Sequence, residues 1–535
     1  MNVIVVLSDS LRVDHVGAYG EGKARTPNLD RFARESALFT RCYVASYPTV
    51  PNRADIWLGR YTFPYRGWQP LEPKDVILPE ILGEHGVTTQ LIFDTPPLLY
   101  GDFYRGFSGW WYIRGQHADP YITDPTIPTP LPAAPHKLKN IKRTRQYLRN
   151  RYDWRFEKDY IAPRTFTKAI EWLERNHTLD KFLLFVDTWD PHEPFDPPTH
   201  YLKLYDDPYR EVDSIIYPRY GHWEYMSSSE LRRVRALYAG EVTMVDTWFG
   251  YLLETVERLG LKENTMIIFT SDHGHLFGEH GLEGKPGGML GRLYEITTRI
   301  PLIIWHPEGY GAGEKFDLIT QPPDLLPTIL DFMEIPIPKT VNGRSLIPAM
   351  KGEEERIREF AVSARFPGRR TEAAVFDGWA GSSRAVAPIT ITSKEWTLIC
   401  HPDPERSELY RIDEDPKQEN NLIEEEPKIA NELRRALIDL LAALGTKSEW
   451  IEPFRLEMRG IKEFLDLETK LYAIRDYEDR VFAFPKRGEA EECLSPEIKS
   501  KKVQEVRFGD LLEEKPKAFI HIEGQYYWAE ELKPI

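Results

Sequence analysis

The sequence contains little cysteine, no long apolar run and no excess of positive charge, and each shortage excludes a class of protein. Its 3 cysteines are far apart, odd in number and without the spacing of a metal site, so we predict neither a disulfide framework nor a zinc knuckle. No segment approaches the roughly 18 apolar residues of a membrane helix. The formal charge of -15 argues against nucleic acid as the main partner. We therefore expect a reducing compartment and neither a membrane nor a nucleic acid as partner.

The first ten residues, MNVIVVLSDS, contain an apolar run at residues 3–7 that has no basic residue before it. A secretory signal peptide has a basic segment followed by a longer apolar one. We therefore interpret this run as a β-strand and expect the protein to be cytoplasmic.

Short apolar runs rich in Val, Ile, Leu and Phe recur along the chain. They are residues 3–7, 91–93, 182–186, 266–269 and 302–305. Such runs, separated by helical patterns, predict a large, mostly parallel sheet flanked by helices on both faces. One helix is predicted after Ser227, because Ser227 and Glu230 form a capping box ahead of an apolar stripe that ends at Gly260. The predicted fold class is α/β.

The 535 residues allow one large domain and smaller additions. After residues 343–346 the pattern becomes acidic and irregular, which places the end of the large domain, residues 1–355, near that point. Residues 356–446 are predicted to form a small α+β subdomain. Residues 447–535 are charged and mixed, and we interpret them as an extension that either wraps around the protein or forms an oligomerisation arm, so a homo-oligomer is possible.

A basic stretch lies within the large domain, with seven Lys and Arg between Lys137 and Arg151 and no acid among them. A solvated helical face is the favoured interpretation of this stretch. The alternative is that it steers anions toward a nearby site.

Polar side chains follow several of the predicted strands. Asp9 follows the first strand, and Asp272 and His273 follow the strand at residues 266–269. Because the carboxyl ends of parallel strands meet at one edge of a sheet, we expect these residues to converge. Two carboxylates and an imidazole suit one divalent cation such as Mn²⁺, Ca²⁺, Mg²⁺ or Zn²⁺. The alternative role for either aspartate alone is a helix cap, but the three residues together favour a metal site.

The stretch SYPTVPNRADIWLGR, residues 46–60, predicts a loop built on two prolines that leads into a helix beginning near Thr49. Thr49 is therefore either a helix cap or a nucleophile. A threonine hydroxyl is a poor nucleophile until a cation or a base favours its alkoxide. The predicted metal would bind Thr49 and activate it.

An anionic ester needs positive charge around its non-bridging oxygens. Arg53 lies one helical turn after Thr49, His192 lies in a proline-flanked turn, and Lys285 lies in a glycine-rich loop. The structural alternatives are a surface salt bridge for Arg53, a purely structural role for His192 and solvent exposure for Lys285. Thr95 follows the strand at residues 91–93 and is assigned to substrate binding, beside aromatic residues at 104–111 that either line a pocket or pack in the core.

Ordered motifs extend over about residues 2–425. They are LSDSLRVDHVGAYG, TPNLDRFARESALFTRCY, TVPNR followed by LGRY, DPHEPF, SDHGHLFGEHGLEGK, YEITTRIPLII, NGRSLIPAMKG and SELYRIDEDPKQENNL. In order and spacing they resemble the sulfatase family of the alkaline-phosphatase superfamily. The resemblance implies a large α/β sandwich with a small antiparallel C-terminal subdomain. It also implies a role for each matching residue: metal ligands at Asp9, Asp272 and His273, the nucleophile at Thr49, and contacts to nucleophile and ester oxygens from Arg53, His192 and Lys285.

Two departures from the family pattern bear on the reaction. Ser10 stands where many members have a second acid, and with His273 in place of Asn the site is more similar to phosphonate monoester hydrolases and choline sulfatases. Thr49 stands where sulfatases have the Cys or Ser that is oxidised to formylglycine, and a threonine cannot become that aldehyde. Water must then attack the ester-bound centre directly, a route that relatives with Thr or Ser nucleophiles use at phosphorus.

These observations predict a metal-dependent hydrolase of a small anionic ester, with a phosphodiester or a phosphonate monoester favoured. A second set of metal ligands has no good candidates, so we expect one ion, with His192 and Lys285 in the place of a second. His192 is the expected acid for the leaving oxygen, since a histidine ordinarily titrates near neutral pH. The alternatives are a sulfuric ester hydrolase that acts without formylglycine and a non-catalytic binding protein with the same fold.

Overall fold

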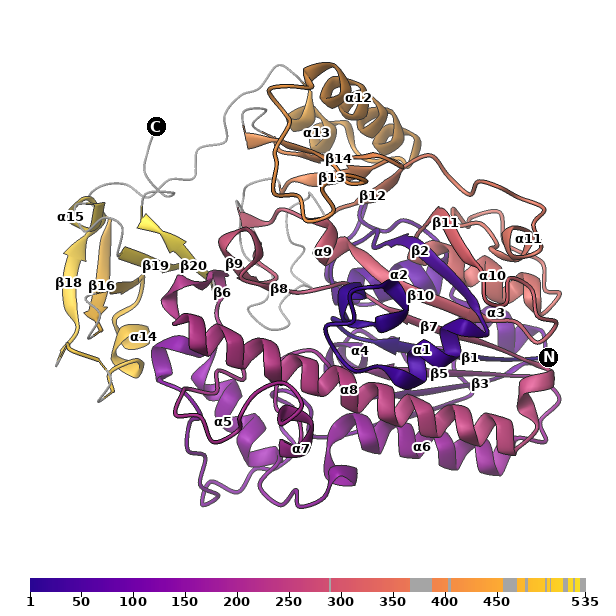
Figure 1. Cartoon of the computed structure of the whole chain (residues 1–535), viewed down its shortest axis with the longest axis horizontal. Coiled ribbons are helices and arrows are strands. Elements are labelled where there is room, and N and C mark those ends of the chain that lie inside the picture. The colour runs from indigo at the N-terminus through magenta and orange to yellow at the C-terminus, as the bar shows by residue number, and fades with distance from the viewer. Residues whose placement is uncertain are drawn as a thin grey trace.

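The computed structural model describes residues 1–287, 290–365, 387–402, 406–455, 469–476, 480–495, 498–500, 502–512, 518–522 and 525–529 (Figure 1). Within these residues an eight-stranded sheet has the order β11-β2-β10-β7-β1-β5-β3-β4. Its strands are β1 (Asn2–Ser8), β2 (Ala37–Tyr43), β3 (Thr88–Phe93), β4 (Gly109–Tyr112), β5 (Phe182–Thr188), β7 (Thr265–Ser271), β10 (Arg299–Trp305) and β11 (Lys315–Thr320). The five predicted strands correspond to β1, β3, β5, β7 and β10. The sheet is mostly parallel, as predicted, and β10 runs antiparallel to both of its neighbours.

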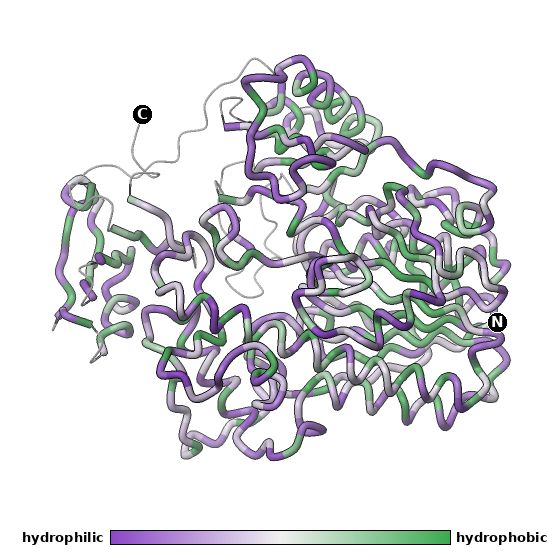
Figure 2. The backbone as a smooth tube through the Cα atoms, viewed as in Figure 1, coloured by the Kyte–Doolittle hydropathy of each residue, from purple (hydrophilic) through white to green (hydrophobic). Residues whose placement is uncertain are grey.

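Each central strand is buried on both faces, because helices pack against both sides of the sheet. Successive side chains of a strand point to opposite sides and therefore join different cores. In β1, Val3 and Val5 join the core that contains α2 (Thr49–Leu58), α3 (Leu78–Glu84) and α10 (Leu325–Phe332). Ile4 and Val6 join the core that contains α6 (Ile161–Asn176) and α8 (Ser228–Arg258). Figure 2 shows the resulting band of apolar strands inside a largely polar outer layer. The predicted α/β fold is confirmed.

The long helix α8 begins as the sequence predicted. The Ser227 backbone N–H donates to Glu230 Oε2 at 2.7 Å, and the Glu230 N–H donates back to Ser227 Oγ at 3.3 Å. This capping box satisfies two backbone donors that would otherwise lack partners at the helix start. Among the described helices, α8 included, none is both long and apolar enough to span a membrane.

A second, antiparallel sheet has the order β12-β13-β14-β15. It comprises β12 (Ala361–Ser363), β13 (Ile389–Thr392), β14 (Trp396–Cys400) and β15 (Glu408–Arg411), and its apolar residues pack with those of α12 (Pro427–Ala443). Backbone hydrogen bonds join it to the chain before α2, since Tyr47 N donates to Ala364 O at 2.8 Å and Ala364 N donates to Ala45 O at 2.9 Å. The small sheet is thereby fixed beside the start of α2.

A third sheet combines strands of the C-terminal region with strands of the large α/β unit, in the order β18-β16-β17-β19-β20-β6-β9-β8. The C-terminal strands are β16 (Lys470–Arg475), β17 (Val481–Phe484), β18 (Gln504–Arg507), β19 (Ala518–Ile522) and β20 (Gln525–Trp528), and the others are β6 (Tyr220–His222), β8 (Leu276–Phe277) and β9 (Leu282–Gly284). β20 pairs parallel with β6, with Tyr526 opposite Gly221. The domain boundaries at residues 355 and 446 and the oligomerisation role stay predictions, and parts of both C-terminal regions, including residues 366–386 and 456–468, lie outside the described residues.

The contact between β6 and β20 depends on a glycine. Gly221 has φ of 109°, and a Cβ there would lie 2.0 Å from the Tyr526 carbonyl oxygen. We expect Gly221→Ala to separate the strands and to lower the free energy of unfolding by more than the roughly 1–2 kcal/mol of a left-handed alanine alone. Gly260→Ala is the matched control, because Gly260 also has positive φ, 69°, but no atom within 4 Å of the added Cβ. Urea denaturation compares the two variants, and equal losses would contradict this account of Gly221.

Candidate active site and metal centre

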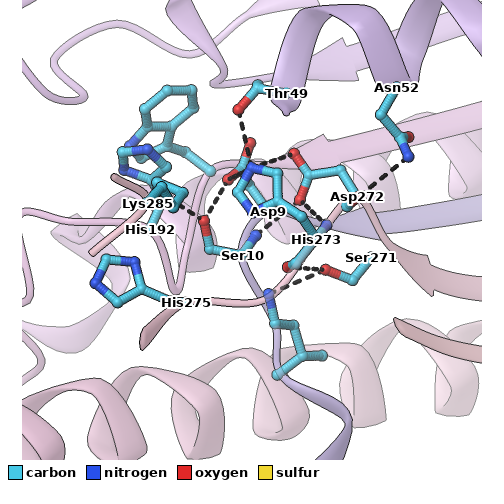
Figure 3. Close-up of polar contacts among 12 residues, drawn as sticks. Asp9, Ser10, Thr49, Asn52, His192, Ser271, Asp272, His273, His275 and Lys285 are labelled. Carbon is cyan, nitrogen blue, oxygen red and sulfur yellow. Dashed lines mark hydrogen bonds and ion pairs between the residues drawn. The ribbon is translucent and has the colours of Figure 1, made fainter. Parts of the chain in front are cut away.

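The candidate site lies at the carboxyl ends of β1, β5 and β7, where α2 begins. Asp9 follows β1, Asp272 and His273 follow β7, and Thr49 is the first residue of α2. All four side chains are at most 1% exposed. Figure 3 shows them turned toward one another. The structure therefore brings together residues that lie more than 200 positions apart in the sequence.

Asp9, Asp272 and His273 have the chemistry of a cation site. One donor atom from each lies within 4.8 Å of the others. His273 Nδ1 lies 2.9 Å from the Gly274 carbonyl, to which it can only donate, so Nε2 carries the lone pair. Asp9 Oδ2 is buried and makes no hydrogen bond to the described residues. Two carboxylates and a neutral imidazole therefore fit one divalent cation.

The ionisation of these residues also fits a cation. Burial, together with the nearby charge of Asp272, raises the pKa of Asp9 well above its usual value. Burial alone would also raise the pKa of Asp272, but His273 and Arg53 lower it below its usual value. Burial lowers the pKa of His273 to about 4, so this histidine is neutral near pH 7. A divalent cation would relieve the repulsion between the carboxylates.

Arg53 holds this set of residues together. Its guanidinium makes two hydrogen bonds to Asp187, of 2.8 and 2.9 Å, and one of 2.5 Å to Asp272 Oδ2. It also lies 3.2 Å from Asp9 Oδ2 and donates to the Thr49 carbonyl at 3.2 Å. The surface salt bridge considered for Arg53 is wrong, because the side chain is fully buried. Since its donors are used within the protein, Arg53 positions the start of α2, and the predicted contact with ester oxygens stays a prediction.

Thr49 faces the three candidate metal ligands Asp9, Asp272 and His273, here called the metal-ligand set. Its Oγ lies 3.2 Å from His273 Nε2, which accepts the hydroxyl proton in this geometry. Pro48, and not Thr49, is the N-cap of α2, and no side chain caps this helix. The helix-cap alternative for Thr49 is therefore wrong, and its hydroxyl is directed at the site.

Lys285 reaches the same site from the segment after β9. Its Nζ lies 3.2 Å from both Ser10 Oγ and Glu193 Oε2, and its side chain is 1% exposed, which excludes the exposed-lysine alternative. Glu193 Oε1 lies 3.3 Å from Lys139 Nζ, and Tyr220 Oη donates to the same oxygen. Burial alone would raise the pKa of Glu193, but the positive charge of Lys285 beside it holds this pKa well below its usual value. Glu193 thus joins two buried lysines.

Lys139 belongs to the basic stretch between Lys137 and Arg151. Its side chain is 11% exposed, and its Nζ lies 3.3 Å from the centre of the Tyr220 ring. The solvated-face interpretation is therefore wrong for Lys139. Lys137 and Arg151 pair with acids elsewhere, at Asp213, Glu230 and Asp196.

His192 is buried against Trp189, with the ring centres 3.9 Å apart. Its Nδ1 lies 2.6 Å from the Glu193 carbonyl and must donate to it, which fixes the ring orientation. Burial lowers the pKa of His192 well below its ordinary value. A neutral imidazole whose only proton is donated to a carbonyl is a poor acid. The sequence prediction of His192 as the acid for the leaving oxygen assumed a pKa near neutrality, and the buried ring does not have one.

Thr95 lies behind Arg53. Its hydroxyl donates to Asp187 Oδ1, and its side chain is fully buried. This contact supports Asp187, and the predicted substrate contact of Thr95 stays a prediction.

Trp110 and Trp111 lie on the edge strand β4 and are 45% and 53% exposed, which excludes the core-packing alternative for them.

Several residues at the site had no assigned role in the sequence. Ser10 N donates to Asp272 Oδ1 and Ser10 Oγ donates to Asp9 Oδ1, both at 2.8 Å. Asn52 Nδ2 donates to the Asp272 carbonyl at 3.0 Å. Asp187 and Glu193 orient Arg53 and Lys285. Ser10, Asn52 and Glu193 lie next to assigned residues in SDS, TVPNR and DPHEPF, and Asp187 directly follows the apolar run at residues 182–186.

Comparison with known proteins places this geometry in context. The family model described as Sulfatase matches residues 1–335, and that described as N-sulphoglucosamine sulphohydrolase, C-terminal, matches residues 278–444. An arylsulfatase of Clostridium perfringens is 25% identical over 483 residues, covering 82% of this chain and 93% of its own length. The multifunctional alkaline phosphatase superfamily protein PehA of Trinickia caryophylli is 24% identical over 425 residues, covering 65% and 76%.

The fold has solved counterparts. The phosphonate monoester hydrolase of Agrobacterium radiobacter superposes with a TM-score of 0.65 and 23% identity, covering 83% of this chain and 96% of its own. This likeness supports the fold, with its large sheet and C-terminal subdomain.

His273 gives the site a testable pH dependence. Its pKa falls from 6.5 to about 4 in the folded state, so the unfolded state binds more protons between these values. In the presence of a chelator, protonation of His273 on unfolding should lower the free energy of unfolding as pH falls from about 6.5 to about 4. The expected slope is up to about 1.4 kcal/mol per pH unit. His273→Asn should flatten the pH dependence measured by urea denaturation. His177→Asn, at the end of α6, is the control, and equal slopes for both variants would refute the assignment.

Proposed function

Because this chain belongs to the sulfatase family, we propose that it is a metal-dependent hydrolase whose nucleophile is Thr49 and whose favoured substrate is a phosphodiester or a phosphonate monoester. The observation that carries the proposal is the 3.2 Å contact between Thr49 Oγ and His273 Nε2, inside the set of Asp9, Asp272 and His273. A divalent cation held by those three residues would supply the Lewis acidity that favours the threonine alkoxide.

The residues of the chain support two chemical steps. In the first, the Thr49 hydroxyl gives up its proton to water, Thr49 Oγ attacks phosphorus, and the bond to the leaving oxygen breaks with its electron pair on that oxygen, so that a phosphoryl or phosphonyl threonine forms. Arg53 holds the Thr49 carbonyl and so fixes where the hydroxyl points. In the second, water attacks the same phosphorus, and the bond to Thr49 Oγ breaks. The Lys285 ammonium, held by Ser10 and Glu193, stabilises negative charge on the ester oxygens in both steps.

Phosphorus is favoured over sulfur because Thr49 is a secondary alcohol that cannot be oxidised to formylglycine. Its ester intermediate then has no second hydroxyl to expel sulfate, and release depends on water attacking the central atom. The charges of the site agree with an ester that carries one negative charge. Glu193 pairs with Lys285, and burial lowers the pKa of Lys139 well below its ordinary value, so the expected metal ion supplies the main uncompensated positive charge beside the ester.

A sulfuric ester hydrolase that uses Thr49 directly is the second candidate. The matches to the Sulfatase family model and to the arylsulfatase favour it. The substrate in either case is a small anionic ester. A cytoplasmic location and a homo-oligomer remain proposals that rest on the sequence alone.

Substitution of Thr49 tests the nucleophile. We expect Thr49→Ala to lower kcat by about 10³-fold or more, since the covalent step is lost. Thr49→Ser keeps a hydroxyl at the same backbone position and should retain activity within about tenfold of the parent. Both variants should still bind one metal ion per chain, as measured by elemental analysis of dialysed protein. Activity of Thr49→Ala within tenfold of the parent would exclude Thr49 as nucleophile.

A side-by-side assay separates the two candidate functions. The substrates are 4-nitrophenyl sulfate, 4-nitrophenyl phenylphosphonate and bis(4-nitrophenyl) phosphate, and release of nitrophenol is followed with each metal in turn. We expect a higher kcat/KM for the two phosphorus esters, with all turnover lost in chelator and restored by a divalent cation. A higher kcat/KM for the sulfate would favour the sulfatase, and a metal-loaded protein inert on all three would favour a binding protein.

A further inference from the structure

Arg365 lies two residues after the small-sheet strand β12 and close to the loop before Thr49. Ala364, directly after β12, hydrogen-bonds through its backbone to Ala45 and Tyr47, and it forms an isolated parallel bridge with Ser46. The next residue, Arg365, is consequently fixed beside the loop that leads to Thr49.

Arg365 contacts two parts of the site. Its guanidinium carbon lies 4.5 Å from the centre of the Tyr47 ring, and this ring lies 5.0 Å from the His273 ring. Its Nη2 donates to the carbonyls of Lys285 and Pro286, at 3.3 and 2.8 Å. The cation therefore lies one aromatic ring away from the metal-ligand set, and its side chain is partly exposed.

No acid balances this cation within the part of the chain that the structure describes. Arg53 and Arg358 each pair with a buried carboxylate, at Asp187 and Asp324, whereas no Asp or Glu among the described residues forms an ion pair with Arg365. Its Nε is buried and makes no hydrogen bond to the described residues, and burial lowers the pKa of Arg365. Placing a charged group in such surroundings without an anion is costly.

The Tyr47 hydroxyl beside it repeats the pattern. It is buried and has no hydrogen-bond partner among the described residues. Buried polar groups in folded proteins nearly always have a partner, so two donors on neighbouring side chains that lack an acceptor among the described residues support a ligand that brings one. A guanidinium on an aromatic ring is a frequent arrangement for binding a planar anion such as a carboxylate.

We propose that Arg365 binds a carboxylate that the substrate carries next to its scissile ester, with Tyr47 as a second donor. The inference rests on the proposed function, because it takes the metal-ligand set as the place of the ester. It narrows the substrate class to carboxylated phosphorus or sulfur esters. The alternative is that Arg365 only pins the Lys285–Pro286 backbone through its two carbonyl contacts.

Calorimetry on the metal-loaded protein distinguishes these roles without turnover. Two ligand pairs differ only by a carboxylate in place of a methyl group: phosphonoacetate with ethylphosphonate, and sulfoacetate with ethanesulfonate. We expect the parent to bind the carboxylated member of at least one pair about 10- to 100-fold more tightly, as for a charge-assisted hydrogen bond. Arg365→Gln, which keeps donors for the carbonyls, should reduce this ratio to near one, and Arg365→Lys should give an intermediate ratio.

Arg411→Gln is the matched control, because Arg411 also lies over an aromatic ring of the small sheet, that of Trp396. It should keep the parent ratio. A parent ratio near one in both pairs, or an unchanged ratio in Arg365→Gln, overturns the proposal. Should Arg365→Gln fail to fold, an unchanged ratio in Arg365→Lys overturns it. Thr49→Ala should keep the ratio, so a failure of the nucleophile assignment and a failure of the carboxylate site give different results.

Discussion

The Arg53 guanidinium is the interaction on which the rest of the site depends. It joins the ends of β1, β5 and β7 through Asp9, Asp187 and Asp272, and it holds the first carbonyl of α2. A buried cation with several carboxylates is stable only when its geometry is complete, and removal of the arginine would leave buried charges of one sign. The same contacts that stabilise the sheet edge therefore determine where the Thr49 hydroxyl points. The cluster of Arg53 with three aspartates therefore both stabilises the fold and positions the proposed nucleophile.

Charge is balanced differently in the two halves of the site. Around Asp9 and Asp272 the carboxylates exceed the nearby positive charge, which favours a bound cation. Beside Glu193, the Lys285 ammonium lies between Glu193 and Ser10, on the side where the ester is expected. The ester is thus expected to lie between an electropositive side made by the protein and one completed by the ion. Arg365, two residues after β12, adds a further positive charge beside the Tyr47 ring.

The sequence predicted the strands and the positions of the candidate ligands because both depend on local patterns and ordered motifs. Burial of β1 on both faces follows directly from its continuous apolar run, and the capping box of α8 is a local signal. The partners of Arg53 and the neutral state of His192 could not be predicted, since they depend on burial and on residues far away in the chain. The same holds for Arg365, whose position depends on pairing between residues 46 and 364.

The most direct test of the central claim is to trap the covalent intermediate. The metal-loaded enzyme is mixed with 4-nitrophenyl methylphosphonate, quenched in acid during the first turnover, digested and sequenced by tandem mass spectrometry. The account predicts a methylphosphonyl group on Thr49, in an amount that matches the burst of nitrophenol. An adduct on another residue, or a full burst with unmodified Thr49, would contradict it.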